Sequence, residues 1–420
     1  MPVKTASHKK VSFAAMFNPK QRFILPLIVF SQFACTSLWF AANAVMPDLV
    51  RELKILPSAI GFITSSVMLG FIAGTLVFAL FAITDRFSPS KVFFINAILA
   101  AIFNISITFG QPDLTMLLLL RFITGFFLAG IYPVGMKIAA DHFANGLGKA
   151  LGFLVGALVL GTAFPHFLKA FGSVLPWKYL IIATSACSVL GGLLVMFFVP
   201  DGPFRQINTI ISFKGVFSVF QKKDFRAAAL GYFGHMWEIY TVWAFLPLIL
   251  QTYLRLHSGY NLNISLFSFL IIASGSIADV IGGYLSQSFG SKMVAATALL
   301  LSGLCCVLSP LFFQFGPILF LSVLFFWNMN IAADSPQFST LTALNAPSEL
   351  KGSALTLVNC IGFSITIISI QLTNSLVLKF NPVYVFPVLA LGPILGLIAL
   401  KPKFFSAQTN ENTTNNLVDK

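Results

Sequence analysis

Long apolar stretches recur along almost the whole 420-residue chain and are separated by short polar connections. Each stretch is close to the roughly 20 residues that an α-helix needs to cross the hydrocarbon core of a bilayer. Continuous apolar runs favour helices over membrane strands, in which apolar and polar residues alternate. We therefore predict twelve spanning helices, at residues 23–46, 58–83, 91–109, 114–136, 147–171, 178–199, 227–253, 263–286, 292–312, 317–341, 352–377 and 383–400.

The composition agrees with this pattern. Hydrophobic residues make up 57% of the chain and charged residues only 9%, whereas a soluble domain carries about 25% charged residues. The five cysteines all fall within predicted spans, so neither a disulfide framework nor a thiol metal site is expected. The sequence predicts an all-α integral membrane protein with no metal and no cofactor.

The distribution of Lys and Arg predicts the orientation in the membrane. An even number of spans places both termini on one side, and most of the 26 basic residues lie on that side, which is typical of the cytoplasmic face. The net charge of +13 then reflects orientation and attraction to anionic lipids, and no nucleic-acid partner is expected. We expect a monomeric, multi-pass protein of a bacterial cytoplasmic (inner) membrane, with both termini in the cytoplasm.

A basic linker at residues 200–226 divides the chain into two halves, 23–199 and 227–400. Similar stretches recur in the same order and at nearly constant offset: "GIYPVG" with Pro133 matches "ADSPQF" with Pro336, and "GKAL" matches "GSAL". Such repeats predict two parallel, pseudo-symmetric six-helix bundles. Residues 1–22 are expected to form a basic cytoplasmic arm without a cleavable signal peptide, and residues 401–420 a disordered cytoplasmic tail.

Two short motifs carry a family resemblance. Asp85, Arg86 and Lys91 of "DRFSPSK" match a short cytoplasmic signature, and "RFITG" has Arg121 and Gly125 four positions apart. With these motifs, the chain resembles the major facilitator superfamily over roughly residues 20–400. The resemblance implies two bundles that move a solute by alternating access around a central cavity.

The match to the cytoplasmic signature is incomplete. Phe81 stands where the signature usually opens with Gly, Ser88 replaces its second Gly, and the copy in the second half lacks both charges. The resemblance nevertheless places Asp85 near the start of the eleventh span, where a helix N-terminus attracts an anion. Asp85 and Arg86 are therefore candidate gate residues.

The resemblance also implies that the first, fourth, seventh and tenth spans face the cavity. Helical spacing places polar or aromatic side chains on one face of each of these spans. Interhelical hydrogen bonds are the alternative role for such residues. The candidate substrate contacts are Gln32, Thr36, Trp39, Asn43, Arg121, Tyr132, Glu238, Thr241, Trp327 and Asn330.

Glu238 lies near the predicted membrane midplane, where an unpaired charge costs at least about 2.5 kcal/mol. One hypothesis makes Glu238 a protonation site, with His235 as a relay and an approaching Arg121 as the switch. A permanent buried ion pair between Arg121 and Glu238 is the structural alternative. A metal site formed by His235 and Glu238 has too few ligands.

Two further carboxylates lie in the second half. Asp279 shares a small polar face with Gly275 and Gly282, which suits close packing against the other half, and a place on the proton path is the alternative. Asp334 precedes Ser335 and Pro336 and is expected to cap a broken half-helix, with a gate or substrate role as the alternative.

The sequence favours a secondary transporter over other membrane proteins. It contains no GxxxxGK[ST] phosphate-binding loop, and its five histidines show no paired acid–base or HExxH pattern. We expect proton-coupled uptake of a small organic or ionic solute. The alternatives are proton-driven efflux of amphipathic drugs or metabolites and, more remotely, a membrane-embedded enzyme or sensor.

Overall fold

The computed structural model describes residues 23–110, 112–143, 147–172, 175–205, 216–347 and 350–401. Over this part of the chain every regular element is a helix. Eleven helical segments are long and apolar enough to cross a membrane, and a shorter apolar helix precedes them. The predicted all-α membrane fold is thereby confirmed, whereas the predicted arm and the tail beyond Lys401 lie outside the described residues.

The first half contains ten α-helices and a short 3₁₀ helix: α1 (Ile24–Thr36), α2 (Ala41–Ala44), α3 (Met46–Leu53), α4 (Ala59–Leu80), α5 (Ile83–Arg86), α6 (Pro89–Ile105), η3 (Ser106–Thr108), α7 (Leu114–Leu128), α8 (Tyr132–His142), α9 (Leu147–Phe171) and α10 (Trp177–Phe198). The second half contains η4 (Val216–Gln221), α11 (Lys223–Leu256), α12 (Ile264–Phe289), α13 (Ser291–Phe312), α14 (Pro317–Ala333), α15 (Ser335–Asn345), α16 (Lys351–Lys379), η6 (Pro382–Tyr384), η7 (Phe386–Ala390) and α17 (Leu391–Leu400).

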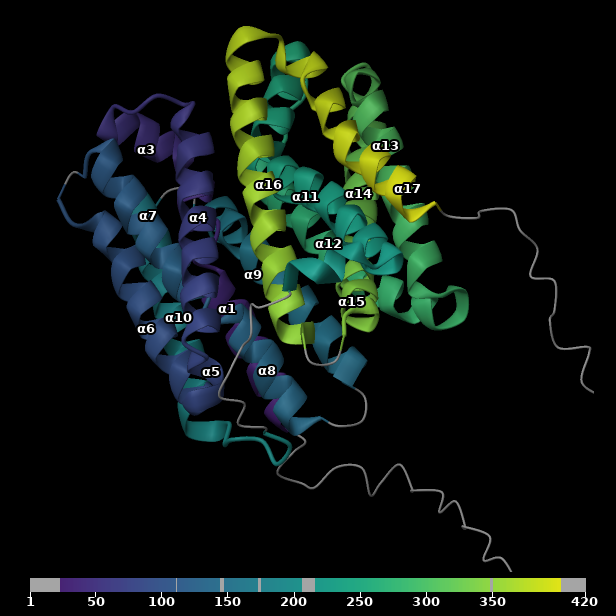
Figure 1. Ribbon diagram of the computed structural model, residues 1–420. Coiled ribbons are helices and arrows are strands. Elements are labelled where there is room, and N and C mark those ends of the chain that lie inside the picture. The colour runs from purple at the N-terminus through teal and green to yellow at the C-terminus, as the bar shows by residue number, and fades with distance from the viewer. Residues whose placement is uncertain are drawn as a thin grey trace, which may run out of the picture.

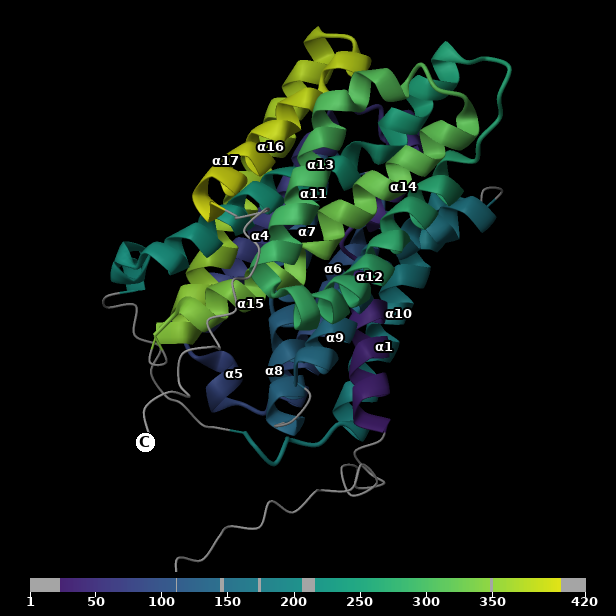
Figure 2. The ribbon, with the colours of Figure 1, turned by 90° about the vertical axis from the view of Figure 1, so that its right-hand side faces the viewer.

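The helices form two groups that stand side by side, α1–α10 and α11–α17 (Figure 1). Helix α9 packs against α12, and α4 packs against α16, so these two pairs join the groups. Figure 2 shows the molecule turned by 90° from the view of Figure 1. In Figure 1, α3 and α5 lie at opposite ends of the molecule. We name these the α3 end and the α5 end. The exact bounds of the two bundles and of the linker stay predictions.

Three of the predicted spans are broken rather than continuous. The first span is interrupted at residues 37–40, where Leu38 and Trp39 donate to carbonyls three residues back in tight turns. The fourth and tenth spans break before Tyr132 and Ser335, with Pro133 and Pro336 in the first turn of α8 and α15. Proline suits this place because a first-turn residue needs no N–H partner. The matched prolines of the two halves therefore mark equivalent breaks.

Glycines allow helices of the first half to pack closely. A Cβ added at Gly125 on α7 would meet the backbone carbonyl of Val67 on α4, and a Cβ at Gly70 would meet that of Phe122. Small residues at such crossings let backbones approach within a membrane. The glycine of "RFITG" is thus a packing residue.

Candidate functional site

Arg121 stabilises the break in the first span. Its side chain is fully buried, and its guanidinium donates to Leu38 O at 3.1 Å, to Trp39 O at 2.5 Å and to Asn104 Oδ1 at 3.1 Å. The two carbonyls lie in the turn between α1 and α2, outside regular helix. The planar guanidinium supplies several donors in a fixed arrangement and so satisfies both carbonyls at once.

Glu238 is held inside the second half by three neutral donors. Its Oε1 accepts from Trp327 Nε1 at 2.7 Å and from Cys306 Sγ at 3.1 Å, and its Oε2 accepts from Ser302 Oγ at 2.9 Å. The carboxyl is 1% exposed. This network orients Glu238 toward α13 and α14.

The permanent ion pair between Arg121 and Glu238 is therefore wrong, and their approach in another conformation stays a prediction. Each side chain is bonded to its own half, so the structure contains neither the switching pair nor the permanent pair. The physical reason is that each charge finds partners nearby: backbone carbonyls for Arg121 and side-chain donors for Glu238. Their roles in substrate binding and proton coupling stay predictions.

His235 and Asp334 make the closest contact between titratable side chains in the interior of the second half. His235 Nδ1 lies 2.6 Å from Asp334 Oδ1, and the two side chains are 2% and 1% exposed. The predicted helix start after Asp334 is confirmed, but the side chain makes no capping hydrogen bond. Asp334 faces His235 on α11 instead. The expected relay from His235 to Glu238 stays a prediction.

Asp279 lies on the packing face of α12 that the sequence predicts. A Cβ at Gly275 would contact Ala332, and one at Gly282 would lie 2.8 Å from Ala333 O, so this face meets α14 near its end. Among the described residues neither oxygen of Asp279 has a hydrogen-bond partner, although the residue is 1% exposed. These glycines approach α14 of the same half, and Gly275 also approaches the other half, where Val159 of α9 lies 3.3 Å from its added Cβ. The expected packing against the other half is therefore met only in part.

Aromatic side chains of both halves meet in one layer. Trp39 stacks on Tyr240 with ring centroids 5.9 Å apart and an angle of 15°, and it lies 5.8 Å from Phe363. Phe71 lies 4.8 Å from Phe363 and 4.9 Å from Trp39. We call Trp39, Phe71, Tyr240 and Phe363 the aromatic cluster. Because all four are at most 6% exposed, the cluster closes the space between the halves at this level.

The aromatic cluster lies next to the carboxylates. Asp279 is close enough to Tyr240 of α11 and Tyr132 of α8 to interact with both electrostatically, and also with Asp334. Tyr132 belongs to the first half, so Asp279 reaches the boundary between the two halves. Asp279 is thus close to Tyr132 of the first half and to Asp334, which in turn contacts His235.

Most other predicted substrate contacts have partners within their own half. Asn43 donates to Thr64 at 2.7 Å, Thr241 to Ser369 at 2.9 Å, and Asn330 to the carbonyl of Phe326 at 2.8 Å. Thr36 donates to the carbonyl of Gln32, whose own amide atoms are buried without a partner among the described residues. Their contact with a solute stays a prediction.

The candidate gate residue Asp85 pairs within the first half. Lys137 Nζ lies 3.0 Å from Asp85 Oδ1 and 3.8 Å from Asp141 Oδ1. The expected position of Asp85 near the start of α16 stays a prediction. Arg86 is exposed at the end of α5. The sequence analysis did not identify Lys137 as the ion-pair partner of Asp85. Its position, a basic residue one turn after Pro133 inside a predicted span, could have indicated such a role.

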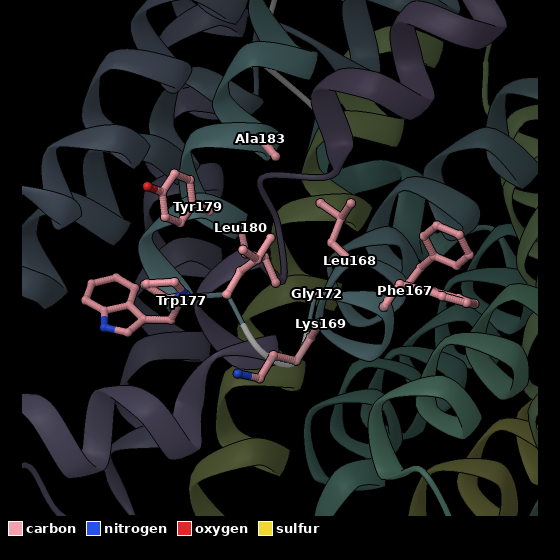
Figure 3. Close-up of a pocket in the computed structure, with 11 residues that line it drawn as sticks. Phe167, Leu168, Lys169, Gly172, Trp177, Tyr179, Leu180 and Ala183 are labelled. Atoms are coloured by element: carbon pink, nitrogen blue, oxygen red, sulfur yellow. The ribbon is translucent and has the colours of Figure 1, made fainter.

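A cavity of about 290 Å³ lies elsewhere, at the α3 end of α9 and α10. Figure 3 shows its lining, with Phe167, Lys169, Trp177 and Leu180 among the labelled residues. All of these belong to the first half, and neither Asp279 nor Asp334 lines this cavity. In the described part of the chain, no group of three or more His, Cys, Asp or Glu side chains is arranged to hold a metal ion.

Comparison with known proteins places the chain in a family. Residues 28–370 match the family model described as Major Facilitator Superfamily. A probable sulfoacetate transporter of Cupriavidus necator is 24% identical over 288 residues, which cover 62% of this chain and 65% of the relative. A benzoate transport protein of Acinetobacter baylyi is 24% identical over 323 residues, covering 66% of each chain.

A niacin transporter of the same Acinetobacter species is 33% identical over 135 residues, covering 29% of this chain and 30% of the relative. The matched regions thus span less than two thirds of each of these relatives. The family model, in contrast, covers most of the chain, from the first span into α16. The helical membrane fold, the paired proline breaks and this match together show that the chain belongs to the Major Facilitator Superfamily.

Proposed function

We propose that the protein is a secondary active transporter that moves a small organic solute across a membrane by alternating access. The family and three relatives named as transport proteins support this activity, and they favour a transporter over an enzyme. The two packed halves supply the parts that alternating access requires, with solute binding at their boundary.

The proposal includes coupling to protons, with uptake as the direction. The observation that carries it is a group of buried titratable side chains. His235 and Asp334 are in contact at 2.6 Å in the interior of the second half, and Asp279 lies nearby. Intramembrane carboxyls and histidines commonly form proton relays. A change in their surroundings as the halves move would alter how tightly they hold a proton. Glu238 is a second proton site in this proposal.

The cellular setting is also proposed. The excess of Lys and Arg near both termini supports a cytoplasmic location for the α5 end. We assign the protein to a bacterial cytoplasmic membrane as a monomer whose partners are the solute, protons and lipids. Proton-driven efflux from the same compartment is the second candidate, because the same carboxyls would serve a proton exchanger.

The first experiment identifies a solute and then measures coupling. A ligand that binds the folded protein raises its thermal midpoint, so purified protein is screened against metabolites and drugs. Uptake of each hit is then followed in proteoliposomes with and without an imposed pH gradient. Accumulation driven by an inward proton gradient supports uptake, accumulation driven by an outward gradient supports exchange, and no transport of any binding compound contradicts the proposal.

The second experiment assigns the proton sites. We expect His235→Gln to reduce gradient-driven uptake at least about tenfold while leaving exchange at equal pH, because the Asp334 contact loses its titratable partner. Glu238→Gln, which keeps an acceptor for Trp327, tests the second site in the same assay. Full proton dependence in both variants would remove these residues from the path.

A further inference from the structure

Asp279 is a buried carboxyl that has no hydrogen-bond partner among the described residues. Both of its oxygens are buried and lack a hydrogen bond to any described residue. Buried carboxyls normally have partners because removing them from water is costly. Packing alone does not explain this residue, since Gly275 and Gly282 on the same face already provide the close approach to α14. The free carboxyl therefore has capacity for a ligand.

The surroundings of Asp279 determine which ligand charge fits. Asp334 adds a second carboxyl close by, and His235 contacts Asp334 rather than Asp279. Two basic side chains of the first half have other partners: Arg121 binds Asn104 and two carbonyls in the turn after α1, and Lys137 binds Asp85. An anionic solute would meet these carboxyls, whereas a cation would offset them.

Aromatic rings complete the environment. Tyr240 interacts electrostatically with Asp279 and stacks on Trp39, which in turn contacts Phe363. Ring faces attract an ammonium group and bury apolar surface at the same time. A carboxyl beside such rings matches a solute that has a positive amino group and an apolar body.

We propose that Asp279 is a substrate-binding carboxylate and that the solute is an organic cation with an ammonium group on an apolar or aromatic body. This inference rests on the proposed transport function. The two groups then have different roles: Asp279 binds the ammonium group of the solute, and the contact between His235 and Asp334 holds the proton. Tyr240 and Trp39 would cover the apolar part of the solute.

Three probes of similar size and different charge test the inference: 2-phenylethylamine, phenylacetate and 2-phenylethanol. The thermal midpoint of the purified protein is measured with each probe at up to 10 mM. We expect only the amine to raise it, by about 2 °C or more. A rise with phenylacetate alone would assign the site to anions, and no rise with the amine would also overturn the inference.

Variants locate the effect. Asp279→Asn should abolish the shift given by the amine, and Asp279→Glu, which keeps the charge, should retain part of it. Asp113→Asn is a matched control, because Asp113 is an exposed cap of α7 and Asn caps a helix as well as Asp. Each variant is first checked for a single peak in size-exclusion chromatography. An unchanged shift in folded Asp279→Asn would refute the assignment.

The two proposals fail in different ways. If 2-phenylethylamine does not bind but another compound from the screen is transported, the transport function stands and the assignment of Asp279 falls. If the amine binds through Asp279 but neither it nor any other hit crosses a proteoliposome membrane, the site stands and the transport function falls.

Discussion

At the scale of single residues, Arg121 shows how a buried charge can stabilise backbone. Its three hydrogen bonds go to two carbonyls and one amide oxygen, and no carboxylate takes part. The guanidinium therefore compensates for helical hydrogen bonds that the break between α1 and α2 gives up. This role places Trp39, whose carbonyl it binds, in position to stack on Tyr240.

We predict that Arg121→Ala lowers the free energy of unfolding by about 3 kcal/mol, because three buried acceptors lose their donors. Arg121→Lys should recover only part of the loss, since one ammonium cannot reproduce the planar arrangement of donors. Thermal unfolding of the purified protein measures both changes. Arg51→Gln is the control: the Arg51 side chain is exposed, Asp48 keeps its pair with Lys169, and the lost pair is worth at most about 1 kcal/mol. Equal midpoints for Arg121→Ala and the control would contradict the role.

At the scale of elements, glycines set how closely α4 and α7 approach. A methyl group at Gly125 would overlap the carbonyl of Val67, so we predict that Gly125→Ala destabilises the protein by about 1–3 kcal/mol. Gly152→Ala on α9 is the matched control, because nothing lies within 4 Å of its added Cβ and alanine favours helix. Its midpoint should stay the same or rise. Chemical or thermal unfolding of the two variants gives the comparison.

The elements also show what the sequence could and could not predict. Hydropathy located the spans, and Pro133 with Pro336 marked two equivalent positions that proved to be breaks. The break at residues 37–40 contains neither Pro nor Gly, and Arg121 stabilises it through carbonyls that every residue possesses. For that reason the partners of Arg121 could not be deduced from residue types, and a pair with Glu238 was the natural expectation.

For the candidate site, the sequence identified the charged residues but not the contacts between them. Asp279, Asp334 and His235 stand out in sequence because charge is rare in a span. Which of them touch depends on the rotation of α11 against the break before α15, and local spacing does not encode that rotation. His235 and Glu238 are three residues apart, yet they contact different helices: His235 meets Asp334, and Glu238 meets α13 and α14.

At the scale of the whole molecule, hydrogen bonds join the two halves at the α3 end. Gln371 on α16 donates to Gly61 O at 3.0 Å and to Ser65 Oγ at 2.8 Å, and Asn374 donates to Ser58 O at 2.9 Å. With the aromatic cluster beside them, these bonds close the boundary on the side opposite α5. Alternating access requires α4 and α16 to separate there once in each cycle.

A reversible cross-link between α4 and α16 tests this requirement. A Cβ at Gly61 would lie 3.0 Å from Asn374 Cβ, near the 3.5–4.5 Å typical of disulfides, so Gly61→Cys with Asn374→Cys should form a bond on oxidation. The background replaces Cys187, the partly exposed native cysteine, with Ser. We predict that oxidation lowers proteoliposome uptake of the solute found by the stability screen at least about tenfold and that reduction restores it.

The control places the same bond inside one half. A Cβ at Gly192 on α10 would lie 2.8 Å from the Cβ of Ala97 on α6, so Gly192→Cys with Ala97→Cys links helices that are expected to move together. Oxidation of this pair should leave uptake nearly unchanged, because a half that moves as a unit loses no motion. If the link from α4 to α16 is equally harmless when fully oxidised, then the halves do not separate at the α3 end during transport.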